Sequence, residues 1–323
     1  MDNKVEIRFD GKRYAFWQEV SIRFSVDDLC SSVSLSITRP GAGDGLGITA
    51  NTIIEVMIGG HLVATVRPDS LTREVDKENH SIHLAARSLG RELVDCRYSQ
   101  TMLGLTLEDI MKRICGAFEV PLKVLTKTAV TPNFAMQCES PANALINAVR
   151  TANLLLYPMQ NGGLVLTKPT DAAPVATLVY GEHILHYRIT DEFKLRFSEY
   201  TIKGYDYSSN HDLDGTVKDD GVSYHRPLQL VADRHGRGLG GCERRAELER
   251  DRRRARARRL DLRILGWRGQ NGGLWGINTK VRVVIPQEGI DGVFLIGDCD
   301  FRLDDRGGGI THLQLMERGA FGR

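Results

Sequence analysis

The feature that most constrains the fold of this chain is an alternation of apolar and polar residues through about the first ninety positions. Val5, Ile7 and Phe9 alternate with polar residues, and Asp10-Gly11 then supplies a two-residue turn. The same period of two returns in short segments centred on residues 20–26, 33–37, 54–58, 62–66, 71–75 and 82–86. Successive hairpins with one buried face predict a small antiparallel barrel or sandwich over residues 1–96.

The apolar period becomes helical over residues 97–182. Thr106 and Asp109 form a capping-box pattern before a helix whose expected apolar face is Leu107, Ile110, Met111, Ile114 and Phe118. Ser140-Pro141 starts a second helix, whose expected buried face is Leu145, Ala148, Val149, Ala152 and Leu156. A turn at Asn161-Gly162-Gly163 then leads into a strand, so this part is predicted to be a mixed α+β domain.

Alternation resumes over residues 183–323, which form the second predicted β region. A glycine-rich loop and an arginine-rich helix at residues 242–259 interrupt it, and residues 207–241 read as a long polar stretch whose conformation the pattern leaves open. The last hairpin runs from Cys299 to Met316 around DDRGGG. The expected fold is therefore mainly β with an α+β insert: two small antiparallel β-barrel domains flank the mixed domain.

The arginine-rich helix is the main candidate functional element, because it concentrates positive charge in a chain whose formal net charge is only +2. Its arginines are Arg244, Arg245, Arg250, Arg252, Arg253, Arg254, Arg256, Arg258 and Arg259. Clustered arginine suits a nucleic-acid backbone, but no aromatic residue interleaves with these to form a stacking platform. Cys242, Ala246, Ala257 and Leu260 mark one narrow apolar side. The favoured interpretation is a helix laid on a neighbour, its arginines solvated or paired with acids of this chain or a partner.

Three other motifs resemble ligand sites without completing them. Residues 236–241 fit the glycine pattern of a dinucleotide site, but no βαβ repeat surrounds them. Residues 210–215 begin like a calcium loop, yet Gly221 stands where the bidentate glutamate belongs. His183 and His186 form an HxxH pair, which we interpret as core or surface histidines and not as a zinc pair. With no GxSxG motif either, we expect no catalytic residues, cofactor or metal.

Composition limits the location of the chain. Hydrophobic residues make up 41% and charged residues 26% of the 323 positions, as in proteins with substantial cores. No run of eighteen apolar residues is present, and the N-terminus lacks the layout of a secretory signal. The six cysteines are widely scattered, so we expect reduced, buried thiols in a protein made in a bacterial cytoplasm.

Several stretches together resemble the baseplate hub proteins of Mu-like contractile phages, a group that includes the hub-like N-terminal part of VgrG spike proteins. ARSLGRELVDC at 86–96 resembles the end of the family's first β domain, and TLEDIMKRICGAFEVPL at 106–122 its first middle helix. The stretch at 139–169 resembles the second helix and following strand, and YTIKGYD at 200–206 the opening of the second barrel. LDLRILGW, VRVVIP and FLIGDCDFRLDDRGGGITHLQL complete the resemblance, which covers essentially the whole chain.

This resemblance implies a structural, non-enzymatic virion protein of a phage or prophage tail. A homotrimer would present a pseudo-sixfold ring that joins the tail tube or other baseplate proteins to the central spike. The arginine-rich helix would lie at a subunit interface or face the channel, where it would contact passing DNA transiently. Two alternatives stay open: a nucleic-acid-binding protein that uses residues 243–259, and a tail-associated cell-wall hydrolase.

Overall fold

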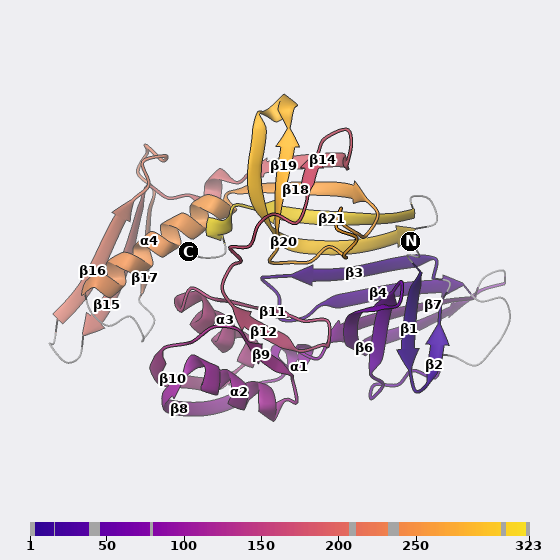
Figure 1. The fold of residues 1–323 in the computed structure, drawn as a ribbon. Helices are drawn as coiled ribbons and strands as arrows, with labels where there is room; N and C mark the ends of the chain where they lie inside the picture. The colour runs from indigo at the N-terminus through magenta and orange to yellow at the C-terminus, as the bar shows by residue number, and fades with distance from the viewer. Residues whose placement is uncertain are drawn as a thin grey trace.

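The computed structural model describes residues 4–15, 17–38, 46–77, 80–206, 211–231, 239–304 and 308–320. Strands dominate it, and the helices cluster in the middle of the chain and in one long arginine-rich element (Figure 1). The expectation of a mainly β protein with an α+β part is therefore confirmed. None of the described helices is both long enough and apolar enough to cross a bilayer.

One large sheet carries strands from both predicted β regions. The first region contributes β1 (Val5–Phe9), β2 (Lys12–Tyr14), β3 (Glu19–Ser25), β4 (Ser32–Thr38), β5 (Ile54–Ile58), β6 (His61–Val75) and β7 (His80–Ser88). The second contributes β14 (Ile184–Asp191), β18 (Arg258–Leu265), β19 (Lys280–Ile285), β20 (Ile290–Asp304) and β21 (Gly308–Met316). β13 (Thr177–Val179) joins the same sheet, although it lies before the expected boundary at residue 183. The order is β14-β18-β21-β20-β3-β4-β7-β6-β5-β1-β2. Outside this order, β19 pairs with β20, and β13 pairs with β19.

The two β regions meet where β20 pairs antiparallel with β3. Their register runs from Asp298 opposite Ser25 to Leu303 opposite Val20. This pairing makes one continuous sheet of regions that alternation alone presented as separate. Closure of either region into its own barrel stays a prediction.

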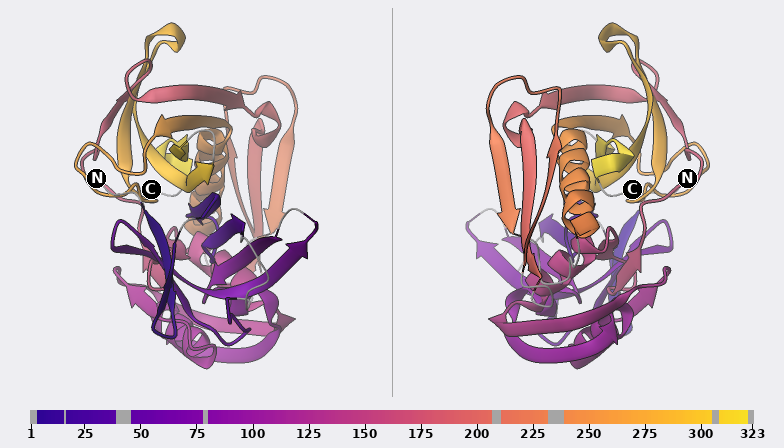
Figure 2. Two further views of the ribbon diagram at one scale, coloured as in Figure 1. Left: turned by 90° about the vertical axis from the view of Figure 1, so that its right-hand side faces the viewer. Right: turned by 90° about the vertical axis from the view of Figure 1, so that its left-hand side faces the viewer.

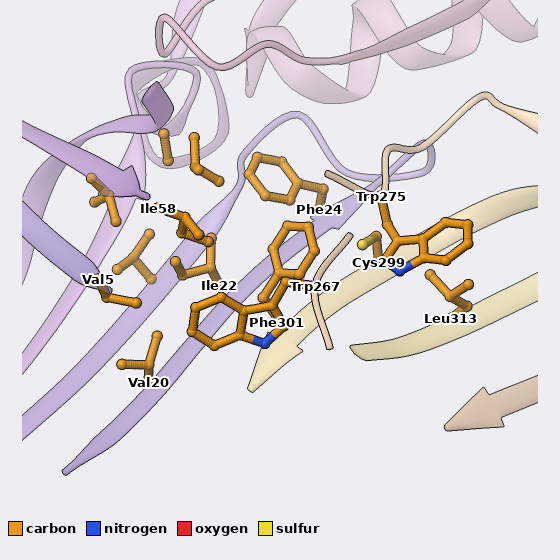
Figure 3. Close-up of a cluster of buried hydrophobic side chains, with 14 of the residues drawn as sticks. Val5, Val20, Ile22, Phe24, Ile58, Trp267, Trp275, Cys299, Phe301 and Leu313 are labelled. Carbon is orange, nitrogen blue, oxygen red and sulfur yellow. The ribbon is translucent and has the colours of Figure 1, made fainter. Parts of the chain in front are cut away.

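A shared hydrophobic core reinforces this junction. The ring of Phe301 on β20 packs edge-on against Phe24 on β3 at 6.4 Å and against Trp267 at 6.2 Å between centroids. Figure 3 shows these side chains among buried residues drawn from both regions. The indole nitrogen of Trp267 donates hydrogen bonds to the carbonyl oxygens of Arg302 and Ile310, so its burial leaves no polar atom unpaired.

The middle of the chain forms a mixed α+β unit, as predicted, but this unit begins at α1, before the expected boundary at residue 97. Its elements are α1 (Arg91–Asp95), β8 (Tyr98–Thr106), α2 (Leu107–Ala117), β9 (Leu122–Val124), β10 (Val130–Glu139), α3 (Pro141–Thr151), β11 (Leu155–Pro158) and β12 (Leu164–Thr167). β8 pairs with β10, and β11, β12 and β9 form a second small sheet. Both sheets and α1, α2 and α3 surround one apolar cluster.

Both predicted helix starts of this unit are confirmed. The Thr106 hydroxyl accepts a hydrogen bond from the Asp109 backbone N–H and donates one to its carboxylate. Ser140 caps α3, with Pro141 in the first turn. The expected face of α2 is buried apart from Phe118, which is partly buried. Ala152 is exposed, because α3 ends at Thr151 and Ala152 is its C-cap.

A third unit projects from the large sheet and was not expected from the alternation pattern. It contains β15 (Glu199–Asp206), β16 (His211–Lys218), β17 (Pro227–Val231) and α4 (Leu239–Arg256). β15 pairs antiparallel with β16 and parallel with β17. YTIKGYD therefore belongs to a separate small sheet instead of opening the second barrel, since its hydrogen-bonding partners are β16 and β17.

Part of the polar stretch at 207–241, whose conformation the pattern left open, is thus strand. Residues 207–210 and 232–238, which include half of the glycine-rich pattern and Asn210 of the calcium-like motif, lie outside the described residues. Within the described part, Asp212 and Asp214 are paired residues of β16. The remaining elements are the 3-10 turns η1 (Phe193–Leu195), η2 (Pro286–Glu288) and η3 (Arg318–Ala320).

The cysteines depart in part from their expected burial. All six are free. Cys115, Cys242 and Cys299 are buried, and desolvation raises the pKa of Cys115 to about 12. Cys138 is exposed, so burial is not common to all six.

Candidate functional site: the arginine helix

Helix α4 is held on the small sheet by a narrow apolar side. Cys242 and Ala246 are fully buried and contact a cluster formed by Tyr200, Ile202 and Leu213 of β15 and β16. The small side chains let the helix approach closely, and Figure 2 shows α4 lying along the sheet. Gly215 of β16 allows the same approach, because a Cβ there would lie 2.1 Å from the backbone nitrogen of Glu243.

The far end of α4 reaches a different core. Ala255 packs in a cluster with Val26, Leu155, Leu295, Met316 and Ala320, from the large sheet, the middle unit and the C-terminal turn. The helix therefore connects the small sheet to the rest of the molecule. The predicted contact of the apolar side with a neighbour holds for Cys242 and Ala246, and that neighbour is this chain, whereas Ala257 and Leu260 lie beyond the end of α4.

The helix ends before the last two predicted arginines. Arg258 and Arg259 belong to β18, so the expected helix over 242–259 is wrong at its C-terminal end. These residues lie opposite Asp191 and Thr190 of β14. The alternating burial of Leu260, Leu262 and Ile264 explains the change, because that period of two fits a strand.

Most of the arginines have partners within the chain. Arg253 donates to Glu249 one helical turn earlier at 2.6 Å, an orientation that favours the helix. Arg250 pairs with Asp251 at 2.9 Å.

Other pairs reach across the fold. Arg256 pairs with Asp27 at 2.6 Å. Arg258 lies 3.8 Å from Asp191, and Arg259 donates to Glu192. Arg245 also takes part in an interaction within the structure. The cluster is thus largely a set of internal links.

Three arginines differ from this pattern. Arg244 and Arg254 are exposed on α4. The guanidinium of Arg252 lies beside Arg150 and donates a hydrogen bond to its backbone oxygen at 3.5 Å. Burial, and after it the neighbouring charge of Arg256, lowers the pKa of Arg252 to about 10.

Phe197 is a partner of this site that the sequence pattern missed. It precedes β15, and its ring centroid lies 5.3 Å from the guanidinium carbon of Arg253 and 4.7 Å from that of Arg226. The lack of aromatic residues between the arginines did not exclude an aromatic partner, because Phe197 lies more than fifty residues before Arg253 in the chain.

The motifs that resemble ligand sites have structural roles where they are described. His183 Nδ1 accepts a hydrogen bond from the backbone N–H of Val179, and its Nε2 lies 3.0 Å from Gln270. Strand β18, which follows α4, pairs antiparallel with β14 and β21, unlike the parallel strand of a dinucleotide fold. No group of histidine, cysteine and carboxylate side chains suited to a metal occurs among the described residues.

Three family models match consecutive parts of the chain. Residues 4–88 match the N-terminal model of Mu phage baseplate assembly protein GpP-like. Residues 91–168 match the second-domain model of baseplate hub protein gp44-like, and residues 241–322 the fourth-domain model of Mu phage baseplate assembly protein GpP. The fold and these matches define the class of the protein: it is a structural component of a phage tail baseplate.

Individual relatives agree with this class. The chain is 29% identical to the baseplate hub protein gp44 of Escherichia phage Mu, over 99% of its own length and 89% of the relative's. A 43 kDa tail protein of prophage MuSo2 from Shewanella oneidensis has the same fold, with a TM-score of 0.89, 24% identity and 99% coverage of both chains. A type VI secretion component of E. coli shares the fold at a TM-score of 0.63 and 8% identity, with 98% of this chain and 78% of that one covered.

The chain is therefore similar to the Mu-type baseplate hub proteins over most of its length, and it is a structural baseplate hub protein. Its relatives are structural tail proteins, and it is a structural virion protein instead of an enzyme. The expected resemblance and the structural function are confirmed.

Proposed function

We propose that this hub protein forms a homotrimeric ring with pseudo-sixfold symmetry that joins the tail tube to the central spike. The observation that carries this proposal is the β20–β3 pairing, which fuses two β regions of one subunit into one sheet. Three such subunits in a closed ring would present six β regions. The apolar core that the two regions share supports this arrangement.

The boundaries at residues 96 and 182 remain part of this proposal. The middle unit has its own apolar cluster, which supports a separate domain here, but Leu93 belongs to that cluster and Leu178 to the core of the large sheet. The ring would then be formed by residues 1–96 and 183–323, and the middle unit would lie beside it.

The arginine helix has a narrower role in this proposal than its composition suggested. The exposed residues Arg244 and Arg254 on α4 and Arg258 on β18 are the members oriented toward solvent, and we place them at a subunit interface or on the channel surface. In the interface they would pair with acids of the neighbouring subunit. On the channel surface they would contact passing DNA.

Absolute mass by light scattering, at low and moderate salt, tests the ring. The expected result is a species at three times the 36.0 kDa of the chain. A clean monomer at every concentration would contradict assembly of the ring by this chain alone.

Light scattering on a variant with Gln at positions 244, 254 and 258, together with a DNA-binding measurement, distinguishes the subunit interface from the channel surface. Loss of the trimer would place these arginines at the interface. An intact trimer whose DNA binding is weaker and less salt-dependent than that of the wild type would place them on the channel. Three phosphate contacts would make the logarithm of the binding constant fall with log salt at a slope of about −2.7.

A further inference from the structure

A small pocket lies where the C-terminal half of α4 meets α3, β11 and the residues that follow β3. One wall is apolar and comes from Val26, α3 and β11. The other wall carries the side chains of Arg150, Arg252, Arg256 and Asp27. We call this the Arg252 pocket. It joins the large sheet, the middle unit and the arginine helix at one point.

Positive charge exceeds negative charge in the Arg252 pocket. The carboxylate of Asp27 lies 2.6 Å from the nearest nitrogen of Arg256 and 4.0 Å from that of Arg150. One acid is therefore shared by two of the three guanidiniums. In the described part of the chain, Arg252 forms no ion pair with any acid, and Glu249 on its own helix is paired with Arg253.

We propose that the Arg252 pocket binds a carboxylate-sized oxyanion. Three guanidiniums present planar forks of N–H donors, whose geometry matches two oxygens of one anion. The anion would supply the negative charge that Asp27 alone does not provide for the three guanidiniums.

The size of the pocket agrees with this ligand. The pocket has a volume of about 30 Å³, roughly twice what one water molecule needs. Two carboxylate oxygens fill such a space, whereas a nucleotide does not. The side chain of Arg150 is 44% exposed, so the ligand can reach the pocket from solvent. The anion has two sources with the same chemistry: a free carboxylate, or an acidic side chain of a second copy of this chain.

Thermal melting of the full chain tests the proposal with sodium acetate as the probe, against sodium chloride at constant ionic strength. Arg252→Met removes the charge but keeps an unbranched side chain of similar helix propensity. Arg254→Met makes the same change at an exposed position of α4 and is the matched control.

Acetate is expected to raise the melting temperature of the wild type and of Arg254→Met in a saturable manner. The acetate midpoint of Arg252→Met should rise by about tenfold or more, as expected for loss of a charge-assisted hydrogen bond. Equal acetate responses in the wild type and Arg252→Met would overturn the proposal.

Asp27→Asn supplies a change in the opposite direction. Removing the resident carboxylate takes a negative charge out of the Arg252 pocket, so this variant should bind acetate more tightly than the wild type does. Weaker binding by Asp27→Asn would contradict the model of a charge-deficient pocket.

Light scattering during the acetate titration distinguishes the two sources of the anion. Dissociation of an oligomer by acetate but not by chloride, together with loss of that oligomer in Arg252→Met, would identify an acidic side chain of another copy. An unchanged oligomer with saturable acetate binding would identify a free carboxylate. No effect of acetate on either melting or mass would overturn the site.

Discussion

Arg256 and Asp27 lie 2.6 Å apart although 229 positions separate them in the chain. Their ion pair ties the last turn of α4 to the end of β3, and Arg256 Nε also donates to the carbonyl oxygen of Ala320 at 3.1 Å. An arginine that looked available for a phosphate or a partner is thus a bond between distant parts of the subunit. The charge of this helix serves first to position it.

Asp27→Asn should therefore loosen α4. We expect a loss of about 1 kcal/mol in the free energy of unfolding, because the pair is partly exposed but charge-assisted. Urea denaturation measures the loss, and hydrogen exchange should show faster opening of α4. Asp291→Asn is the control: it breaks an equally direct pair with Arg282 at 2.8 Å, but both side chains are more than half exposed. An equal loss of unfolding free energy in the two variants would show that the Asp27–Arg256 pair stabilises α4 no more than an exposed ion pair does.

Asp219 gives a prediction about acid stability. Its side chain is 2% exposed and receives two hydrogen bonds from Arg196, at 2.7 and 3.0 Å. The hydrogen bond from Arg196 is the main cause that lowers the pKa of Asp219. The folded protein thus keeps this carboxylate charged at pH values where an unfolded aspartate, with a pKa of about 3.9, is already protonated.

The stabilising contribution of Asp219 is complete above the unfolded pKa and is lost as pH falls through the lower folded value. Asp219→Asn should cost about 3 kcal/mol at neutral pH, since it leaves the partly buried Arg196 without its counter-charge. Its stability should also fall less steeply than that of the wild type below about pH 4. Asp220→Asn, at the exposed neighbouring position, should change neither quantity. A parallel acid limb in Asp219→Asn and the wild type would contradict the assignment.

Ile114→Asp should unfold the middle unit. Ile114 is 1% exposed on the inner face of α2, where an unpaired carboxylate would have no partner. We expect a loss of more than about 4 kcal/mol, measured as disappearance of the melting transition of this unit. Arg113→Asp places the same charge on the exposed side of the same helix and should retain that transition. A native transition in Ile114→Asp would show that the helix face is misassigned.

Gly215→Ala should displace α4 from its sheet. The added Cβ would lie 2.1 Å from the backbone nitrogen of Glu243, and backbone cannot move aside as a flexible side chain does. We expect about 1–3 kcal/mol of destabilisation, as for overpacking of a core, with the unfolding of α4 followed by hydrogen exchange. Gly276→Ala is the control, because a Cβ there meets nothing within 4 Å. Unchanged protection of α4 in Gly215→Ala would mean that the helix is less closely seated than the structure shows.

Local patterns determined much of this protein. Alternation located the strands of the first β region, and Thr106 and Ser140 marked the helix starts, because strand period and helix capping depend on residues only a few positions apart. The order of several short stretches along the chain also indicated the resemblance to baseplate hub proteins.

Tertiary structure alone decided how these elements meet. The pairing of β20 with β3, the small sheet under α4, the ring of Phe197 beside Arg253 and the bond from Arg256 to Asp27 all join residues far apart in the chain. The physical reason is that periodicity states which face of a segment is apolar, but not which other segment covers it. A charge likewise states that a counter-charge is favourable, and only the folded chain decides where that counter-charge lies.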